Sequence, residues 1–392
     1  MIAIILAAGK GIRMQPLSLT KPKPLLKINN KSVLEHNLEQ LNGLVNEVIL
    51  VIGYKGEMIK NLIGDKFKNI KIRYVWQKKH LGTGDAAKKA MPYIKDRFIL
   101  MNGDDLYEKN DIKNCLKKFP SILLAKSKNP ESFGVAITSE NYVENLAEKP
   151  KSPTSNLVNT GFYFLDKSIF NFKIKKSKRG EYEFTDYIKK LIRKEKLYFG
   201  LAKNWIPLSC SHNLLDANEF LLKKIKKKIL GKVEKNCEIK GDVIIEKGTI
   251  IKNGSYIEGP VYIGKNCEIG PNCHIRGATS INDNCHISQA VEIKNSIIGS
   301  NSKICHLSYV GDSIIGEYCN LGGGTIVANL RHDRETIKVI IKKKKVDTGK
   351  RKFGTVLGDK VKTGIGTLIY PGRKIWPQKT TLPGEIVKED IL

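Results

Sequence analysis

Between residues 239 and 293 an isoleucine stands at every sixth position. A helix repeats its buried face every 3.6 residues and a half-buried strand repeats every second residue, so neither element alone gives this spacing. A short strand followed by a tight turn does give it, and glycines such as Gly241, Gly248 and Gly254 punctuate the stretch. The pattern predicts a coiled repeat whose isoleucines point inward, each contributing about 1.5 to 3 kcal/mol by burial.

Three of these six-residue units, which we call hexads, make one turn of 18 residues. This repeat resembles the hexapeptide-repeat left-handed parallel β-helix. The resemblance implies a stack of triangular coils, in a fold that departs from the usual right-handed crossover. After Ile293 the spacing between successive inward positions is five residues instead of six at two places, which indicates altered corners between the short strands. The shifted positions are Ile298, Ile304 and Val310, and then Ile315, Leu321 and Val327.

We call the inward isoleucines at every sixth position the ladder. Two cations each come directly after a ladder isoleucine. Arg276 and Lys294 are 18 residues apart, so the repeat predicts that they stack on one edge at a coil spacing of about 4.8 Å. A pair of cations at this spacing suits a phosphate group. Two solvated corner charges in a lysine-rich chain are the alternative interpretation.

The first part of the chain has a different pattern and predicts an α/β domain. The apolar run at 2–8 reads as a buried strand, 33–44 as a helix and 47–53 as a second strand. The run DANEFLLKKIKKKIL, residues 216–230, reads as an amphipathic helix that links this domain to the hexads. We therefore expect an α/β Rossmann-like domain at 1–222, a helical linker at 223–231 and a left-handed parallel β-helix at 232–392. Residues 331–352 interrupt the hexad spacing. We expect them to form a hairpin that extends away from the coils, which we call the excursion hairpin.

Composition limits the classes of function. The net charge of +29 rests mostly on lysines spread along the whole chain, which does not favour nucleic acid as the primary partner. No apolar run is long enough for a membrane span, and the start lacks the features of a signal peptide, so we expect a cytoplasmic protein. Five of the eight cysteines occupy an inward slot two residues before a ladder position, which predicts core thiols and neither disulfides nor zinc: Cys237, Cys267, Cys273, Cys285 and Cys319.

The first strand is followed at once by the glycine-rich run GKGIRM. Such a turn lets backbone N–H groups approach phosphates, and Arg13 and Lys23 are available to neutralise charge. The full run LAAGKGIRMQPLSLTKPKPLL resembles the signature of the sugar-1-phosphate nucleotidylyltransferases. The resemblance implies that Ala8, Gly9 and Gly11 bind the nucleotide and that Arg13 and Lys23 are catalytic cations.

Later segments extend the resemblance to about residue 222. The run WQKKHLGTGDA implies that Gln77, Gly82 and Thr83 face the pyrimidine of UTP or dTTP. The strand FILM ends in NGDD, and Asp104 at the carboxyl end of a buried parallel strand is well placed to hold Mg²⁺, although a turn aspartate is the plainer interpretation. Four residues are implied to hold the sugar 1-phosphate: Gly134, Glu148, Lys149 and Asn159.

One position departs from the family pattern. The family has W-x-D before its final helix, where the last residue completes the metal site, and this chain has Trp205, Ile206 and Pro207. A proline side chain cannot coordinate a cation. Asn213 likewise replaces a common aspartate. Weak or lost nucleotidyl transfer is therefore an open alternative.

The stretch from Arg276 to Val327 resembles the acetyltransferase half of the bifunctional sugar-1-phosphate nucleotidylyltransferase/acetyltransferases, through H-L-x-Y-x-G-D and N-x-G-x-G-T. The resemblance implies acetyl-CoA as co-substrate and a homotrimer. It implies that His306 is the general base for the amine of an amino-sugar 1-phosphate. It assigns the 1-phosphate to Arg276, Lys294 and Tyr309, and the positioning of sugar and acetyl group to Asn320 and Asn329.

Three hypotheses follow. The first is a bifunctional enzyme that acetylates an amino-sugar 1-phosphate, such as glucosamine 1-phosphate, and couples the product to a uridylyl or thymidylyl group. The second keeps acetyl transfer alone. The third is a non-catalytic subunit like those of translation-factor exchange complexes, which the joint presence of Arg13, Lys23, Asp104 and His306 disfavours. The choice between glucosamine and galactosamine, and between uracil and thymine, stays open.

Overall fold

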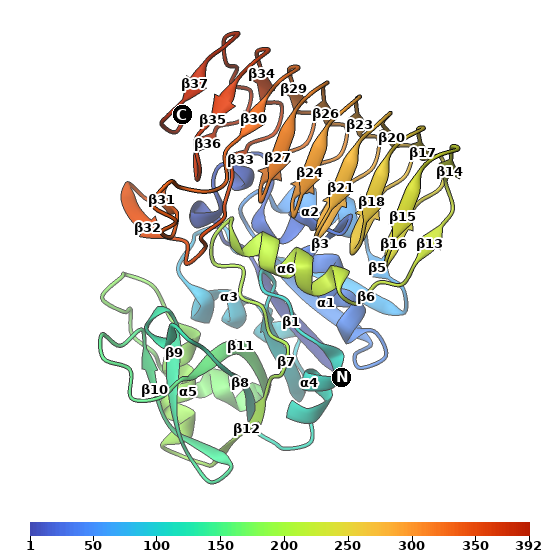
Figure 1. The fold of residues 1–392 in the computed structure, drawn as a ribbon. Coiled ribbons are helices and arrows are strands. Elements are labelled where there is room, and N and C mark those ends of the chain that lie inside the picture. Colours follow the sequence, from blue (N-terminus) through green and yellow to red (C-terminus); the bar gives the residue numbers. More distant parts are fainter. The chain divides into compact units, whose positions relative to one another are not determined.

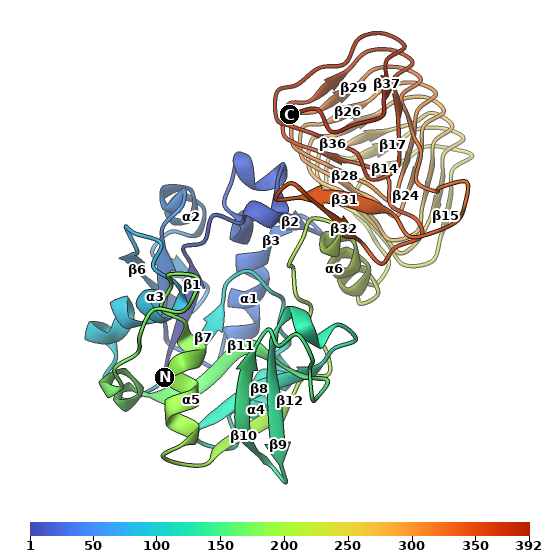
Figure 2. The same ribbon diagram turned by 90° about the vertical axis from the view of Figure 1, so that its left-hand side faces the viewer.

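The computed structural model describes residues 1–392, which form two compact units (Figures 1 and 2). The α/β unit consists of Met1–Lys10 and Val33–Pro207. The β-helix unit consists of Leu208–Leu392 together with an early stretch, Gly11–Ser32, which we call the inserted segment. The residue boundaries expected for the two domains stay predictions. None of the helices combines the length and apolar character that crossing a membrane requires.

A ten-stranded sheet in the order β5-β6-β4-β1-β7-β11-β8-β12-β10-β9 forms the centre of the α/β unit. Strand β1 (Ile2–Ala7) pairs in parallel with β4 (Glu47–Ile52) and β7 (Arg97–Asn102), and β4 pairs in parallel with β6 (Ile70–Trp76). Because these strands are parallel, their carboxyl ends lie at one edge of the sheet, where α/β proteins bind ligands. Strand β11 (Leu157–Asp166) runs antiparallel to β7 and brings its first residues to the same edge.

The remaining elements of this unit complete the sheet and supply its helices. The helices are α1 (Val33–Leu41), α2 (Gly56–Ile63), α3 (Thr83–Ala90), α4 (Lys109–Cys115) and α5 (Phe184–Ile192). The other strands are β5 (Lys66–Phe67), β8 (Ser121–Lys126), β9 (Gly134–Ser139), β10 (Tyr142–Glu148) and β12 (Leu197–Leu201), and β2 (Lys27–Ile28) pairs with β3 (Lys31–Ser32) inside the inserted segment.

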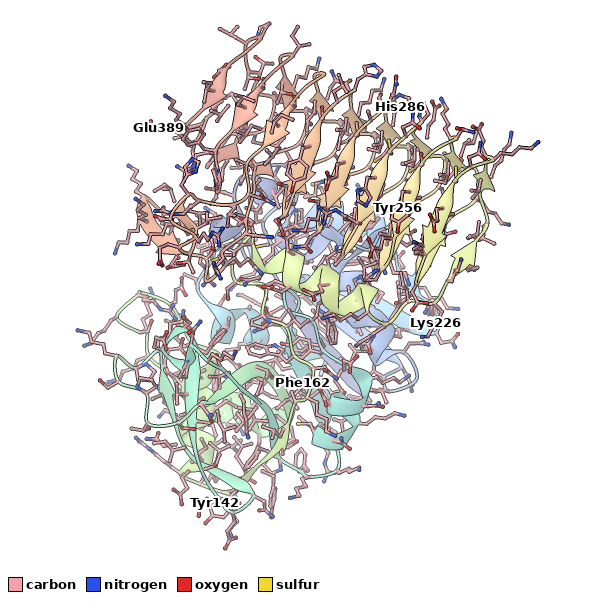
Figure 3. All side chains as sticks on the ribbon, in the orientation of Figure 1. Tyr142, Phe162, Lys226, Tyr256, His286 and Glu389 are labelled. Atoms are coloured by element: carbon pink, nitrogen blue, oxygen red, sulfur yellow. The ribbon has the colours of Figure 1, made fainter.

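The hexads form a left-handed parallel β-helix of three sheets, as predicted. Each strand pairs in parallel with the strand one coil later, so that Ile257 lies in register with Ile239 and Ile275. The ladder isoleucines from Ile245 to Ile293 have no exposed surface, which confirms that they point inward. Outward positions carry polar and aromatic side chains such as Tyr256 and His286 (Figure 3).

Successive short strands of the coils belong to the first, second and third sheet in turn. The first contains β13 (Lys228–Ile229), β16 (Val243–Ile245), β19 (Val261–Ile263), β22 (Thr279–Ile281), β25 (Ile297–Ile298), β28 (Ile314–Ile315), β33 (Val356–Leu357) and β36 (Lys374–Ile375). The second contains β14 (Lys232–Val233), β17 (Ile250–Ile251), β20 (Glu268–Ile269), β23 (His286–Ile287), β26 (Lys303–Ile304), β29 (Asn320–Leu321) and β34 (Lys362–Thr363). The third contains β15 (Glu238–Lys240), β18 (Tyr256–Glu258), β21 (His274–Arg276), β24 (Glu292–Lys294), β27 (Tyr309–Gly311), β30 (Ile326–Val327), β35 (Leu368–Ile369) and β37 (Ile386–Val387).

Buried thiols and hydroxyls fill the corners. The inward-slot cysteines are free, and four are buried while Cys237 is half-buried. Where the ladder shifts early, Ser296 occupies the corner, with its hydroxyl donating to Lys294 O at 2.8 Å and accepting from Ser313 N at 3.0 Å. These bonds give the Lys294 carbonyl and the buried Ser313 amide hydrogen-bond partners at the corner.

The helix before the hexads differs from the expected one. Helix α6 spans Asn213–Leu222, and the expected helical linker at 223–231 is wrong because Lys228 and Ile229 already pair with β16 as the first strand of the β-helix. Pairing with a preformed coil outweighs the helical pattern of the lysine-rich run. Within α6 the buried Asn218 donates to Ala278 O at 2.6 Å. The predicted excursion is confirmed as a hairpin of β31 (Lys338–Ile341) and β32 (Lys344–Asp347).

Replacing an inward isoleucine and, separately, its outward neighbour tests whether the inward positions form the core. Ile251→Ala removes a side chain with no exposed surface, and we expect it to lower the free energy of unfolding by about 2 to 5 kcal/mol. Ile250→Ala, on the same strand but 36% exposed, should change it by about 0.5 kcal/mol. Urea denaturation followed by circular dichroism measures both changes, and equal losses would contradict the inward packing.

Candidate active sites

The carboxyl ends of β1, β4 and β6 bring together residues far apart in sequence. Gly53, which follows β4, lies against Ala8: a Cβ on this glycine would be 3.0 Å from both the Cβ and the carbonyl oxygen of Ala8, and 3.1 Å from Gln77 O. The backbone N–H of Tyr54 donates to Ala8 O at 3.2 Å. Open space surrounds the Cα of Gly9. The predicted residues Ala8, Gly9 and Gln77 therefore share one edge of the sheet.

The predicted base-reading residues are tied to each other by hydrogen bonds. Gln77 is buried, and its side-chain amide donates to Gly82 O at 3.0 Å and to Asp85 Oδ2 at 2.9 Å. Asp85 was not singled out from the sequence, although it lies in the motif run that contains Gln77. Its carboxylate fixes the orientation of the Gln77 amide, which a residue that reads a base requires.

Gly82 is a glycine for a steric reason. Its φ is +101°, and a Cβ there would lie 2.5 Å from Tyr182 O and 2.9 Å from Tyr182 N. Thr83 opens helix α3, and its hydroxyl accepts from the backbone N–H of Phe184 at 3.0 Å. The stretch before α5 thus forms the support for this turn.

Asp104 lies just beyond β7, at the same edge of the sheet. Gly103 N donates to Leu6 O at 2.9 Å, which joins this turn to β1. Burial raises the pKa of Tyr107 well above its ordinary value, and the charges of Asp105 and Asp104 raise it further. Two acidic residues therefore concentrate negative charge at the end of β7.

The donor set at Asp104 suits Mg²⁺ only if the substrate completes it. Leu106 and Ile206 form an antiparallel bridge, with N–H to O distances of 3.0 and 3.1 Å, so that Pro207 comes beside Asp105. The proline thus occupies the place that the family pattern gives to a second ligand. No group of three or more His, Cys, Asp or Glu side chains forms a ready-made metal site. Mg²⁺ commonly takes one or two carboxylates and fills its other positions with water and substrate phosphates.

Three of the predicted sugar residues lie together. Gly134 is the register partner of Glu148, and a Cβ on Gly134 would be 3.3 Å from Glu148 Oε2 and 3.6 Å from Asn159 Cβ. The side-chain amide of Asn159 donates to the hydroxyl of Tyr163 at 2.6 Å. Lys149 follows Glu148 directly, and its backbone N–H donates to Phe133 O at 3.0 Å.

A cation that sequence reasoning missed lies beside this group. Arg179 Nη2 is 3.8 Å from Glu148 Oε1 and 2.7 Å from Glu183 Oε1. Nothing in the run of lysines around it distinguishes this arginine in the sequence.

The other residues of the glycine-rich signature belong to the inserted segment of the β-helix unit. Gly11 has a φ of +60°, and Ser18 Oγ donates to its carbonyl oxygen at 2.8 Å. A Cβ at Gly11 would be 3.1 Å from the Cβ of Lys23, a buried residue. Gly11 and Lys23 therefore lie together, and Arg13 faces a cavity of the same unit.

In the β-helix unit the predicted cation pair is confirmed in register. Arg276 on β21 lies directly beside Lys294 on β24. Glu292 accepts from Arg276 Nε at 2.9 Å and from Nη2 at 2.6 Å, which fixes the guanidinium on this face. Burial lowers the pKa of Lys294, partly offset by Asp312, whose Oδ2 is 3.8 Å from its amine.

Asp312 is the centre of this group and was not singled out as a site residue, although it closes the H-L-x-Y-x-G-D run. It is 4% exposed, and it accepts from Asn295 Nδ2 at 2.7 Å and from Asn329 Nδ2 at 2.5 Å. Asn329 also donates to the hydroxyl of Tyr309 at 3.1 Å. One buried carboxylate thus orders Lys294, Asn329 and, through Asn329, Tyr309.

His306 lies on the exposed turn between β26 and β27. Its carbonyl oxygen accepts from Gly324 N at 2.8 Å in the next coil, which fixes the turn. Asn320 reaches the same place, because its Oδ1 is 3.9 Å from the sulfur of Cys305, the residue before His306. The imidazole is therefore on an open face, free to meet a ligand.

Comparisons with known proteins cover both halves of the chain. The nucleotidyl transferase family model matches residues 2–224, and the GMPPB C-terminal domain model matches residues 257–391. The bifunctional protein GlmU of Methanocaldococcus jannaschii is 48% identical over 96% of this chain and 92% of its own. A bifunctional sugar-1-phosphate nucleotidylyltransferase/acetyltransferase of Sulfurisphaera tokodaii is 39% identical over 100% of this chain and 98% of its own.

This chain belongs to the bifunctional sugar-1-phosphate nucleotidylyltransferase/acetyltransferase family. The predicted family is thereby confirmed. Among solved structures, a putative glucose-1-phosphate thymidylyltransferase from Bacillus anthracis in complex with a sucrose matches with a TM-score of 0.53 at 24% identity, covering 58% of this chain and 98% of its own. That likeness concerns the fold of the nucleotidyltransferase half.

A substitution at Gly311 tests the arrangement of the side chains around Asp312. Gly311 follows Arg276 and Lys294 in the same column, and a Cβ there would lie 2.4 Å from the hydroxyl oxygen of Tyr309 and 2.6 Å from Asn329 Nδ2. Gly311→Ala should displace both groups by about 1 Å and lower thiol release from acetyl-CoA by about 10²-fold.

Gly323→Ala is the matched control for this change. The nearest atom to a Cβ at Gly323 is His306 O at 3.6 Å, an ordinary contact, so we expect little change in rate. Unchanged acetyl transfer in a folded Gly311→Ala protein would mean that Tyr309 and Asn329 do not position the substrate.

Proposed function

We propose that the protein acetylates an amino-sugar 1-phosphate with acetyl-CoA and transfers a nucleotidyl group from UTP or dTTP to the resulting sugar 1-phosphate. The name of one relative states sugar-1-phosphate nucleotidylyltransferase and acetyltransferase activities for that protein, which supports the proposal. The observation that carries the proposal is the clustering of the residues inferred for acetyl transfer: Lys294, Tyr309 and Asn329 form one hydrogen-bonded and ion-paired group around Asp312, and Arg276 lies beside Lys294 in register. UDP-N-acetylglucosamine is the product that we expect, with galactosamine and thymine as the variants to test.

In acetyl transfer the amine nitrogen attacks the thioester carbonyl. The C–N bond forms, the C–S bond breaks and coenzyme A leaves as a thiolate, which becomes the thiol when the protonated base returns the proton to its sulfur. His306 accepts the proton that the amine loses, a contribution of roughly 10² to 10⁴ in rate. Arg276 and Lys294 neutralise the 1-phosphate, and Tyr309 donates to it through its hydroxyl. Asn320 and Asn329 orient the sugar and the acetyl group.

In nucleotidyl transfer an oxygen of the sugar 1-phosphate attacks the α-phosphorus of the nucleoside triphosphate and pyrophosphate leaves. Positioning and charge neutralisation supply most of the rate in such a step. We assign the base to Gln77, Gly82 and Thr83, and the sugar phosphate to Gly134, Glu148, Lys149 and Asn159. The backbone at Ala8, Gly9 and Gly11 faces the phosphates, with Arg13 and Lys23 as cations. Mg²⁺, held by Asp104 and substrate phosphates, would supply further neutralisation when bound.

The setting of the reaction is also a proposal. The free, mostly buried cysteines are in keeping with a reducing cytoplasm. We propose a homotrimer in which the open face that carries His306 is completed by a neighbouring copy, since an exposed base needs a second wall to exclude water. Nucleic acid is not proposed as a partner.

Acetyl transfer alone is the second candidate. Pro207 beside Asp105 leaves Asp104 without the second protein ligand that the family pattern provides. The non-catalytic scaffold is disfavoured because it requires none of the ordered contacts around Asp312.

Two single changes separate the activities. His306→Ala should lower thiol release from acetyl-CoA and glucosamine 1-phosphate by about 10² to 10⁴-fold and leave pyrophosphate release from UTP and N-acetylglucosamine 1-phosphate unchanged. Asp104→Ala should do the reverse. His286→Ala, which changes a half-buried histidine on β23, is the control and should affect neither. Loss of both activities through either change in a folded protein would exclude two separate sites.

The lowered pKa of Lys294 predicts a pH dependence. Because burial lowers this pKa, the lysine loses its charge at a lower pH than a free lysine does, and the KM for glucosamine 1-phosphate should rise earlier in the alkaline range. Arginine keeps its charge throughout this range, so Lys294→Arg should remove that rise. The amine of the substrate titrates equally in both assays, and identical KM profiles for the two proteins would refute the assignment.

A further inference from the structure

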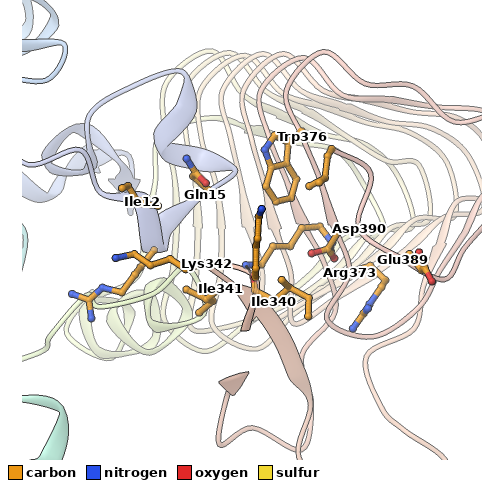
Figure 4. A pocket seen from close by; sticks show the side chains of 13 residues that line it. Ile12, Gln15, Ile340, Ile341, Lys342, Arg373, Trp376, Glu389 and Asp390 are labelled. Carbon is orange, nitrogen blue, oxygen red and sulfur yellow. Dashed lines mark hydrogen bonds between the residues drawn. The ribbon is translucent and has the colours of Figure 1, made fainter. Parts of the chain in front are cut away.

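The β-helix unit contains a cavity of about 620 Å³ in which Arg13 is the only lining residue assigned to either reaction. Its walls come from three parts of the chain: the 3₁₀ turn at the start of the inserted segment, the tip of the excursion hairpin, and the last coil with the carboxyl-terminal residues. Figure 4 shows Ile12 and Gln15 on one side, Trp376 on the other, and Lys342, Ile341 and Ile340 below them. The volume is in the range of small-molecule sites.

Hydrogen bonds hold the hairpin and the carboxyl-terminal residues onto the last coil. Lys374 is 2% exposed, and its amine donates to Ile340 O at 2.8 Å while its backbone N–H donates to Asp390 Oδ1 at 2.9 Å. Arg373 Nη2 donates to Lys338 O at 3.3 Å. The backbone N–H of Trp376 donates to Ile391 O at 2.8 Å. The cavity is therefore preformed on this side.

Ion pairs fix the inserted segment on the coils. Lys21 Nζ lies 2.8 Å from Glu317 Oε2 and 3.2 Å from Asp359 Oδ2, and all three side chains are at least three-quarters buried. The hydroxyl of Thr20 donates to Asp359 Oδ2 at 2.7 Å. These contacts hold the segment on which Arg13 enters the cavity.

The lining combines an aromatic and aliphatic wall with an excess of cations. Trp376, Ile12 and Ile340 supply the apolar surface. The cations Arg13, Lys342, Lys343, Arg373 and Lys374 outnumber the acids Glu389 and Asp390. Such a mixture suits a ligand with a flat ring and a strongly anionic group.

The hairpin tip adds a second indication. Lys342 and Lys343 form its two-residue turn with φ of +49° and +62°. Both positions of such a turn favour asparagine or glycine, and lysine is uncommon there. A residue kept in an unfavourable conformation points to a role for its side chain. Both of these lysines line the cavity.

We propose that this cavity binds a nucleoside phosphate, with the base against Trp376 and the phosphates between Arg13, Lys342 and Lys343. A free phosphate would leave the apolar wall without a contact, and a sugar phosphate lacks a planar ring to lie against the indole. The ring and the charge together select the nucleotide class.

The site is also regulatory, a step that rests on the proposed function. Arg13 is the signature arginine assigned to nucleotidyl transfer, so a nucleotide in the cavity engages a cation that the reaction needs. Nucleotidyl transfer therefore slows as the cavity fills, whereas acetyl transfer does not.

Tryptophan fluorescence of the full chain tests binding. In a Trp76→Phe/Trp205→Phe protein Trp376 is the remaining tryptophan. UDP should quench it saturably, and Lys342→Ala/Lys343→Ala should weaken binding at least about tenfold. Lys344→Ala/Lys345→Ala removes the same charge from the same hairpin outside the cavity and should change binding less than about twofold. ADP in place of UDP shows which base is preferred.

Three results would overturn the proposal. These are no quenching by UDP or ADP, equal weakening by both lysine pairs, and pyrophosphate binding as tightly as UDP. If the double-phenylalanine protein does not fold, Trp376→Phe in the otherwise unchanged chain should lose the saturable signal, and retention of that signal would count against the site.

The regulatory step has its own assay. UDP should inhibit pyrophosphate release in the unchanged protein more strongly than in the Lys342→Ala/Lys343→Ala protein, and equal inhibition refutes regulation. A protein that binds UDP at Trp376 but never releases pyrophosphate refutes the proposed nucleotidyl transfer and leaves the binding site standing.

Discussion

Direct stacking of inward side chains from coil to coil is the constraint on which the β-helix unit depends. Each ladder isoleucine lies above its counterpart one coil earlier, and parallel backbone pairing keeps the two in register. The residues next to the ladder isoleucines in sequence point outward, and the same register fixes their positions. Arg276, Lys294 and Gly311 therefore fall in one column on the surface. The alignment of these residues on one face is a consequence of packing in the interior of the coils.

The α/β unit reaches a comparable result by different means. Its candidate residues come from the ends of parallel strands, and sharp turns at Gly82 and Gly103 let backbone segments approach closely. Here the order comes from backbone geometry and a few buried amides such as Gln77. In the β-helix the order comes from one buried carboxylate, Asp312, that holds several side chains at once. Removing a single group should therefore disturb the second arrangement more widely than the first.

Much of this architecture is encoded in local pattern, and what is not local was missed. The hexads predicted the coils and the stacking of Arg276 on Lys294, because a repeat converts sequence distance into spatial distance. The helix expected through Leu230 was wrong, since pairing of Ile229 with a distant strand outweighed a nearby helical pattern. The placement of Gly11–Ser32 in the β-helix unit depends on contacts made more than 200 residues later, such as that of Asn30 with Asp283. Asp312 was visible in a motif, but only its hydrogen bonds distinguish it from a turn aspartate.

The two halves of the sequence are consequently not two independent modules. The glycine-rich turn passes from Gly9 in one unit to Gly11 in the other, with Lys10 between them. The cations that follow, Arg13 and Lys23, are carried on a segment whose ion pairs with Glu317 and Asp359 are made to late coils of the β-helix. Part of the glycine-rich signature is therefore held in place by contacts with those coils. The sequence order of the two halves does not coincide with the two structural units, because this early segment packs with residues that come about 300 positions later.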